Sequence, residues 1–178
     1  MPHSDYDLAG IRAAIITTNN RVLAGERPDR GGQLAVEQLA AAGLQTSEPV
    51  VIPEEHHAVA EQLRDSLDEG NRLVIVLGGT GFGIRHESPE VVREAIEVEI
   101  PGIAEQIRAH GLTNTPLSPL SREVVGVTAR DKTGALVVAS PQLEGRGRRH
   151  AVGTDPPVEG HLRPARRDLS PHKPPDAG

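Results

Sequence analysis

The chain of 178 residues contains no cysteine, no tryptophan, one tyrosine and one phenylalanine. Without cysteine, disulfides, thiolate metal sites and cysteine nucleophiles are all excluded. With so few aromatic rings, the chain offers no row of platforms on which nucleic-acid bases could stack. The formal net charge of −6 also argues against a surface that follows a phosphate backbone. We therefore expect no nucleic-acid partner.

Long apolar runs are missing as well. The strongest apolar run, LVIVL at 73–77, is far shorter than the roughly 20 residues that a membrane-spanning helix needs. The first five residues, MPHSD, place an acid where a signal peptide carries basic residues. These features predict a cytoplasmic protein that has no membrane partner.

What the sequence does contain is an alternation of short apolar runs and amphipathic segments. Runs rich in β-branched residues predict buried strands at 11–18, 49–52 and 73–77. Apolar residues at helical spacing predict helices at 33–42, 54–67, 90–96 and 103–110. Two late strands, joined by a turn around 131–134, are expected at 124–128 and 135–139. This order predicts an α/β fold of three layers, a mainly parallel sheet covered by helices on both faces.

The pattern also indicates where the domain begins and ends. Residues 11–142 carry the alternating elements and follow a short N-terminal extension at 1–10. Residues 143–178 are crowded with Gly, Pro, Arg and His and show no periodic apolar face. Such composition predicts a low-complexity, disordered tail. Its arginines could contact an acidic partner, but a solvated tail is the better interpretation.

A glycine-rich loop follows the strand at 73–77 directly and contains Gly78, Gly79, Thr80 and Gly81. Glycine suits backbone with positive φ and places where a ligand approaches closely. Successive N–H groups there can form an anion-binding nest, to which the Thr80 hydroxyl adds a donor. The spacing matches neither the Walker motif nor the dinucleotide fingerprint. A tight turn without a ligand explains the glycines equally well on this ground alone.

Other candidates lie near this loop in the sequence. Ser88, Pro89 and Glu90 form a good helix start with Ser88 as N-cap, which needs no function, although a helix N-terminus could add a second anion-binding wall. Three further pairs have two interpretations each. Arg85 and Arg122 could bind phosphate or form surface ion pairs. Ser118 and Ser121 could donate to an anion or shape a turn, and His57 and His86 could be metal or acid–base groups or surface residues.

Taken together, these segments resemble the molybdopterin-binding domain of the MoaB/Mog family over residues 11–141. The most specific match is GGTG at 78–81 followed by Ser88-Pro89-Glu90, where the family usually has Thr-Pro-Glu. Four more segments fall in register, namely GERPDRGG at 25–32, IPEE at 52–55, IPGIAEQIR at 100–108 and TPLSPLSR followed by VGV at 115–127. Any one match is weak, but five in register are hard to explain by coincidence.

The resemblance implies an activity and a set of site residues. Adenylyltransferase members of the family transfer AMP from ATP to the phosphate of molybdopterin with Mg²⁺, and the family is commonly trimeric. Carried over by position, Gly78, Gly79, Thr80 and Gly81 would hold phosphate. Ser88, Glu90, Ser121 and Arg122 would bind the pterin or its phosphate. Glu54 would be a catalytic carboxylate and a magnesium ligand.

Departures from the family pattern leave the activity open. His86 stands where the family has an aspartate, and neutral imidazole is a poor ligand for magnesium. The strand at 135–139 leads to Ala139-Ser140-Pro141 instead of Leu-Pro-Gly-Ser-Pro. We therefore keep three hypotheses, all with a pterin or other anionic small-molecule ligand. They are an adenylyltransferase, a catalytically silent molybdopterin binder or scaffold, and an enzyme in which His86 near Glu54 acts as an acid–base group.

Overall fold

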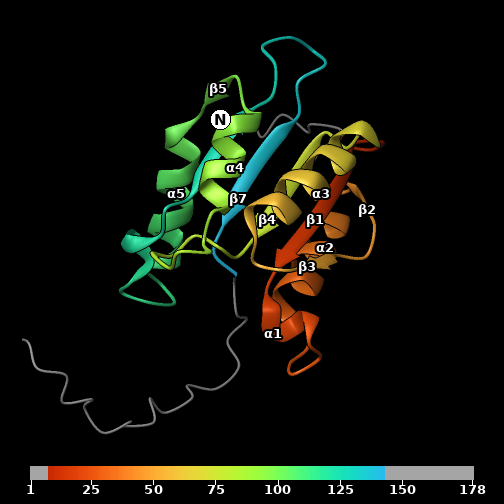
Figure 1. Cartoon of the computed structure of the whole chain (residues 1–178). Coiled ribbons are helices and arrows are strands. Elements are labelled where there is room, and N and C mark those ends of the chain that lie inside the picture. Colours follow the sequence, from red (N-terminus) through yellow and green to blue (C-terminus); the bar gives the residue numbers. More distant parts are fainter. Residues whose placement is uncertain (1–7, 143–178) are drawn as a thin grey trace, which may run out of the picture. The chain divides into compact units, whose positions relative to one another are not determined.

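The computed structural model describes residues 8–142 of the chain (Figure 1). It contains one sheet of seven strands in the order β2-β1-β4-β7-β6-β5, in which β3 also pairs with β1. The strands are β1 (Arg12–Thr18), β2 (Gln45–Thr46), β3 (Val50–Ile52), β4 (Leu73–Leu77), β5 (Val98–Glu99), β6 (Val124–Val127) and β7 (Leu136–Ser140). The helical segments are α1 (Asn20–Leu23), α2 (Arg30–Ala41), α3 (His56–Asp68), α4 (Ser88–Ala95), α5 (Pro101–Gly111) and the 3-10 turn η1 (Ser118–Leu120).

The sheet is mainly parallel, as the sequence predicted. Strand β1 pairs in parallel with β2, β3 and β4, and β4 pairs in parallel with β7. Strand β6 runs antiparallel to both of its neighbours, β5 and β7. In register, Thr17 lies opposite Leu77, and Leu77 lies opposite Ser140. The carboxyl ends of β1, β4 and β7 therefore meet at one edge of the sheet.

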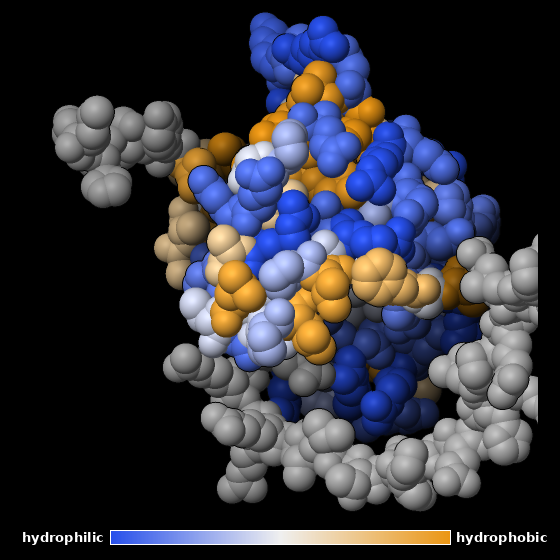
Figure 2. Space-filling view, turned by 90° about the vertical axis from the view of Figure 1, so that its left-hand side faces the viewer, coloured by the Kyte–Doolittle hydropathy of each residue, from blue (hydrophilic) through white to orange (hydrophobic). Residues whose placement is uncertain are grey.

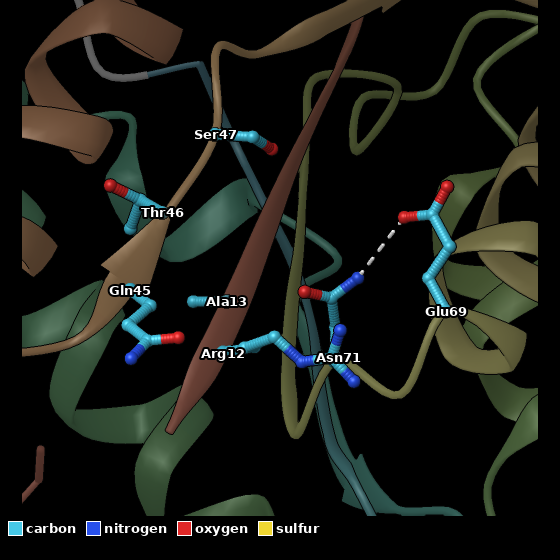
Figure 3. Close-up of a pocket in the computed structure, with 7 residues that line it drawn as sticks. All are labelled: Arg12, Ala13, Gln45, Thr46, Ser47, Glu69 and Asn71. Carbon is cyan, nitrogen blue, oxygen red and sulfur yellow. Dashed lines mark hydrogen bonds between the residues drawn. The ribbon is translucent and has the colours of Figure 1, made fainter. Parts of the chain in front are cut away.

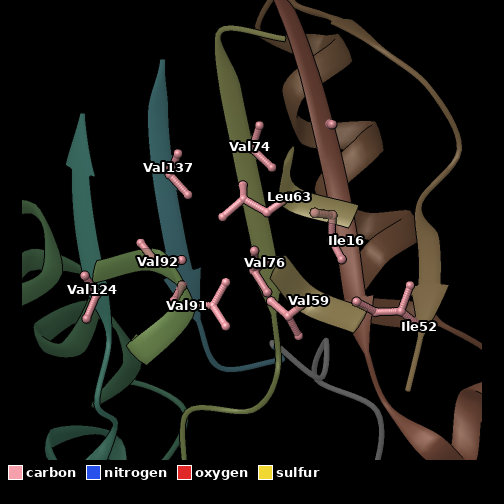
Figure 4. Packing of buried hydrophobic residues seen from close by; sticks show 12 residues of the cluster. Ile16, Ile52, Val59, Leu63, Val74, Val76, Val91, Val92, Val124 and Val137 are labelled. Atoms are coloured by element: carbon pink, nitrogen blue, oxygen red, sulfur yellow. The ribbon is translucent and has the colours of Figure 1, made fainter. Parts of the chain in front are cut away.

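Side chains that alternate along β4 build two cores, one on each face of the sheet. Val74 and Val76 pack with residues of α3 and α4, including Val59, Leu63 and Val92 (Figure 4). On the opposite face, Leu73 and Ile75 belong to a second cluster with Ala104, Ile103 and Ile107 of α5. Each fully buried Val, Ile or Leu contributes about 1.5–3 kcal/mol to folding. Burial on both faces explains why the β4 run is continuously apolar, and it confirms the predicted α/β/α layers.

The predicted loop at 19–32 is wrong in part, because it contains α1 and the start of α2. Asn19 caps α1 through its side chain, which accepts hydrogen bonds from the amides of Arg21 and Val22. Asp29 caps α2 by accepting from the amide of Gly32. Side-chain caps of this kind satisfy the first free amides of a helix. The Asn19 and Asp29 caps therefore favour helices in a segment whose Gly and Pro residues predict turns.

Two predictions of domain organisation fall largely outside the described residues. The predicted extension at 1–10 enters them only from Leu8 onward, and the predicted tail at 143–178 does not enter them. Within residues 8–142, no helix is both long enough and apolar enough to cross a bilayer.

Candidate functional site

The glycine loop leaves β4 at the edge where the parallel strands end. The Gly78 amide donates to the carbonyl oxygen of Ser140 at 2.9 Å, which ties the loop to the end of β7. A Cβ at Gly78 would lie 2.5 Å from the carbonyl oxygen of Thr18 at the end of β1. The loop thus passes directly over the carboxyl ends of β1, β4 and β7. Ligands of open α/β sheets usually bind at this edge.

Two consecutive glycines give the loop its shape. Gly78 has φ +104° and Gly79 has φ +65°, both in the region that L side chains rarely adopt. Any Cβ at Gly79 would collide with the Ser88 hydroxyl at the start of α4. The sequence Gly78-Gly79 therefore lets the backbone turn sharply and lie against α4. A turn of this type brings successive amides together, which is the arrangement of an anion nest.

Ser88 carries an unpaired hydroxyl in the interior. The residue is only 1% exposed, and its Oγ has no hydrogen-bond partner among the described residues. The prediction that Ser88 caps α4 is wrong, because Glu87 occupies the N-cap and Ser88 is already helical. A buried hydroxyl without a partner costs about 1–3 kcal/mol. Such groups are uncommon in folded proteins, and a water, an ion or a ligand oxygen would satisfy this one.

Thr80 and Ser121 extend the same surface. Thr80 is buried, and its Oγ1 accepts a hydrogen bond from Ser121 Oγ at 3.2 Å. The Thr80 carbonyl oxygen accepts from the amide of Arg122 at 3.1 Å. With its Oγ1 oxygen bonded to Ser121, Thr80 keeps its own hydroxyl hydrogen to donate. Ser88, Thr80 and Ser121 therefore supply three hydroxyl groups around the start of the loop.

Arg122 holds the loop in place. Its Nε donates to the Gly81 carbonyl oxygen at 3.0 Å, and its two terminal nitrogens bond to the Glu90 carboxylate and the His86 carbonyl oxygen. The family resemblance implies that Arg122 binds pterin or phosphate directly, but its guanidinium is already engaged with the protein on three sides. The planar fork of arginine suits such a clamp, which a lysine cannot form.

We expect Arg122→Lys to destabilise the protein by roughly 1–3 kcal/mol, because charge-assisted hydrogen bonds to the loop are lost while the positive charge remains. Urea unfolding measures the change. Arg130→Lys is the matched control, since Arg130 pairs with Glu97 but is 73% exposed and should change stability little. An Arg122→Lys variant as stable as the parent would show that the clamp does not hold the loop.

His86 and Glu54 lie side by side at the rim of this surface. Nε2 of His86 lies 3.8 Å from Oε2 of Glu54. The other ring nitrogen, Nδ1, accepts a hydrogen bond from the Gly83 amide at 3.3 Å, so the ring proton of the neutral form lies on Nε2 and faces Glu54. A Cβ at Gly81 would lie 2.7 Å from the same Nδ1. The loop therefore wraps closely around the imidazole.

The metal-binding capacity of this part of the chain is limited. Within residues 8–142, no three His, Asp or Glu side chains come together as a ligand set. The Glu54 carboxylate, which pairs with His86, is the acid at the rim. Mg²⁺ usually binds one or two carboxylates and completes its shell with waters and substrate phosphates. Glu54 fits that requirement as a single protein ligand.

A polar network beside the site was missed by sequence reasoning. Asp29 accepts from Thr17 Oγ1 at 2.7 Å and from Gln142 Nε2 at 3.2 Å. Gln142 in turn accepts from Asn19 Nδ2 at 2.8 Å. These contacts join the ends of β1 and β7. The bonded residues are 113 positions apart in one case and 123 in the other. The available signal was Asp29 in the GERPDRGG segment, but its partner Gln142 has no local pattern to mark it.

Glu123 is a second surprise, a buried carboxyl directly before β6. Its side chain is 1% exposed and lies 3.8 Å from Arg108. Ser140 Oγ donates to its Oε1 at 3.2 Å. Burial raises the pKa of Glu123 above its usual value, although the hydrogen bond from Ser140 and the charge of Arg108 work in the opposite direction. The pKa of Glu123 is therefore higher in the folded state than in the unfolded state. The contribution of this carboxyl to stability is fully present below its unfolded-state pKa and is lost as the pH rises through its folded-state pKa.

Glu123→Gln is therefore expected to stabilise the protein at pH 7 by on the order of 1 kcal/mol, since the buried charge is removed. The gain should shrink as the pH falls toward the ordinary glutamate range, where the parent carboxyl is also neutral. Urea unfolding at pH 7 and at acid pH measures both. Glu105→Gln, at an exposed position of α5, should change stability little. A loss of stability at pH 7 in the Glu123 variant would contradict the assignment.

A separate pocket lies at the other end of the sheet, where β1 and β2 begin. Its walls come from the starts of both strands and from the segment after α3, and Asn71 Nδ2 contacts Glu69 Oε2 at 3.5 Å (Figure 3). The lining residues are Arg12, Ala13, Gln45, Thr46, Ser47, Glu69 and Asn71. None of the residues singled out in the sequence lies there. The glycine loop, with its unpaired buried hydroxyl, is the stronger candidate site.

Comparison with known proteins connects this geometry to a family. Residues 14–149 match a family model described as "Probable molybdopterin binding domain". The chain belongs to this family. Its relatives include molybdopterin adenylyltransferase of Escherichia coli K12, which is 30% identical over 64% of this chain and 60% of the relative. A molybdenum cofactor biosynthesis bifunctional protein of Synechococcus elongatus is 30% identical over 65% of the chain and 36% of the relative.

Solved structures agree with the family assignment. The molybdopterin biosynthesis enzyme MoaB from Thermus thermophilus is 35% identical and superposes with a TM-score of 0.64, covering 75% of this chain and 82% of that one. The molybdopterin biosynthesis Mog protein from Mycobacterium ulcerans is 32% identical with a TM-score of 0.67, covering 76% and 86%. The predicted MoaB/Mog resemblance is confirmed. The chain spans between a third and three fifths of the two curated relatives above.

The site residues that the family resemblance implies lie together in this one region of the fold. Ser88 lies against Gly79, Ser121 contacts Thr80, Arg122 joins Gly81 to Glu90, and His86 lies beside Glu54. Ser118 does not join them, because its hydroxyl donates to the Arg108 carbonyl oxygen at 2.7 Å. His57 is also elsewhere, paired with Glu61 on the surface of α3.

Proposed function

We propose that this member of the molybdopterin-binding family binds molybdopterin and transfers AMP to its phosphate from ATP. The observation that carries the proposal is the Ser88 hydroxyl, buried and without a hydrogen-bond partner among the described residues, directly against Gly79. A phosphate oxygen at this position would accept from Ser88 and from the amides of the loop. The 30% identity to a molybdopterin adenylyltransferase supports the choice of ligand.

The reaction is an exchange at phosphorus. An oxygen of the pterin phosphate bonds to the α-phosphorus of ATP, the bond to the β-phosphate oxygen breaks, and pyrophosphate leaves. Catalysis of this kind depends on positioning and on stabilising the charge that spreads over the oxygens. Loop amides and the hydroxyls of Ser88 and Thr80 would hold the phosphates, while Ser121 orients the Thr80 hydroxyl by donating to its oxygen. Arg122 and Glu90 would keep the loop in its working shape.

Glu54 would hold Mg²⁺, together with phosphate oxygens and water. Bound there, the cation would neutralise charge on the ATP phosphates and orient them. His86 lies 3.8 Å from the Glu54 carboxylate. The Nε2–H group of His86 faces that carboxylate and would compete with the cation for it, so we expect weaker magnesium dependence than a two-carboxylate site would show.

Isothermal titration of the full chain with molybdopterin and with ATP and magnesium tests the binding. A coupled assay for pyrophosphate tests the transfer. We expect both ligands to bind and pyrophosphate to be released only when both are present. Absence of binding by either ligand would end the proposal. The homotrimer expected from the family resemblance is a separate prediction that analytical ultracentrifugation can check.

A catalytically silent molybdopterin binder is the second candidate, and the His86 side chain favours it. Imidazole occupies the position where the family has an acid, and it is held by the Gly83 amide instead of being open to a cation. This candidate predicts pterin binding without pyrophosphate release. Comparison of the parent with a His86→Asp variant distinguishes the two functions. The second carboxylate would strengthen a weak activity if the parent is an enzyme, and would create an activity if the parent has none.

A further inference from the structure

The tip of the glycine loop, residues 82–85, exposes apolar side chains. The proposed phosphate cradle, formed by residues 78–81 and Ser88, would need none. Phe82 is 75% exposed and Ile84 is 95% exposed. With Tyr6, Phe82 is one of two residues of the whole chain that carry a Phe, Tyr or Trp ring. A single exposed hydrophobic residue is ordinary. Here the chain's only phenylalanine lies on the loop itself, two residues after Thr80.

The tip is held close to the phosphate cradle at both ends. Before it, the Gly81 carbonyl oxygen is bound to Arg122 at 3.0 Å. After it, the His86 amide donates to the Gly83 carbonyl oxygen at 2.9 Å. Two residues of extended chain span at most about 7 Å, so the Cα of Phe82 lies within that distance of the Cα of Thr80. A ring attached to the bound phosphate ester therefore comes within reach of Phe82.

The charge at the tip fits the same ligand. Arg85 is exposed, and among residues 8–142 no carboxylate or carbonyl oxygen pairs with it. An apolar ring and an exposed guanidinium on one short loop match a planar heterocycle that carries phosphate. On the face that corresponds to the left-hand side of Figure 1, apolar side chains lie among polar ones (Figure 2). Leu112, Leu117 and Leu120 are each more than half exposed, but nothing in the structure shows what covers them.

We propose that Phe82 is a specificity-determining residue that stacks on the planar base of the bound nucleotide. The inference rests on the proposed phosphate site. Aromatic stacking tolerates any flat heterocycle, so Phe82 would select ring-bearing phosphates over inorganic ones. Glycines on both sides of Phe82 let its backbone adjust to the ring.

Titration of the full chain with ATP and with inorganic triphosphate tests the proposal. Phe82→Ala should raise the Kd for ATP roughly 5- to 150-fold, the equivalent of about 1–3 kcal/mol, and leave the Kd for triphosphate unchanged. An unchanged Kd for ATP, or an equal rise for both ligands, overturns it. An altered oligomeric state with unchanged ATP binding also overturns it and assigns Phe82 to an interface between copies. If the parent binds neither ligand, the phosphate site itself is wrong.

Because the chain contains no tryptophan, a tryptophan introduced at position 82 can report ligand binding by its fluorescence. Phe82→Trp provides the chain's only indole, whose fluorescence should change on addition of ATP and stay constant with triphosphate. Val50→Trp is the matched control, because Val50 is 41% exposed on the edge strand β3 and its indole should respond to neither. Equal responses to ATP and triphosphate at position 82 would contradict stacking.

Discussion

Gly78→Ala is expected to destabilise the fold by roughly 2–4 kcal/mol, the sum of backbone strain and overpacking. Gly78 has φ +104°, and a Cβ there would lie 2.5 Å from the Thr18 carbonyl oxygen. That oxygen belongs to the backbone at the end of β1, so a side-chain rotation cannot relieve the contact. The Gly78 amide would also be pulled from Ser140. Urea unfolding gives the change directly.

Gly102→Ala is the control for that measurement. Gly102 lies in α5, and a Cβ there would meet no atom within 4 Å. Alanine should therefore stabilise the helix by up to about 1 kcal/mol. If the two variants had similar stability, the close approach of the loop to β1 would be wrong, and the cradle could not have the shape described above.

Ser88→Ala is expected to separate ligand binding from stability. Removal of a buried hydroxyl that has no partner among the described residues should leave the free energy of unfolding unchanged or raise it by up to about 1 kcal/mol. The same change should weaken the binding of inorganic triphosphate roughly 10- to 150-fold, because a hydrogen bond to a charged oxygen contributes about 1.5–3 kcal/mol. Calorimetry measures the affinity, and thermal unfolding measures the stability.

Ser118→Ala should give the opposite result. Its hydroxyl is also buried, but it donates to the Arg108 carbonyl oxygen at 2.7 Å. Its loss should lower stability by about 1 kcal/mol and leave triphosphate binding as it is. A Ser88→Ala variant that loses stability and keeps its affinity would show that the Ser88 hydroxyl serves the fold and not a ligand.

Most of the fold could be predicted because its strands are buried on both faces. The run at 73–77 was predicted residue for residue, since five consecutive apolar residues, three of them β-branched and followed by two glycines, are typical of a central strand. The short strands β2 and β5 have two residues each and leave no periodic signal. Helix α1 depends on the Asn19 cap, a single side chain that also suits a turn.

The site was predictable where residues are close in the sequence and unpredictable where the fold joins distant ones. The glycine loop and Ser88 lie within eleven residues of each other, so the motif marked them. The contacts of Arg122 within the protein were not predicted, because its bonds to Gly81, His86 and Glu90 span 32 to 41 positions. The Asp29–Gln142 contact spans 113 positions. Partners this far apart leave no pattern in a single sequence.

The most direct test of the account is an NMR titration of the ¹⁵N-labelled full chain with inorganic triphosphate. We expect the amide resonances of residues 78–81 to shift most as the anion binds. Ser88→Ala should reduce the affinity derived from those shifts while leaving the amides of the separate pocket around Arg12 and Asn71 unaffected. Shifts centred on that pocket, or none at residues 78–81, would contradict the claim that this loop holds a phosphate.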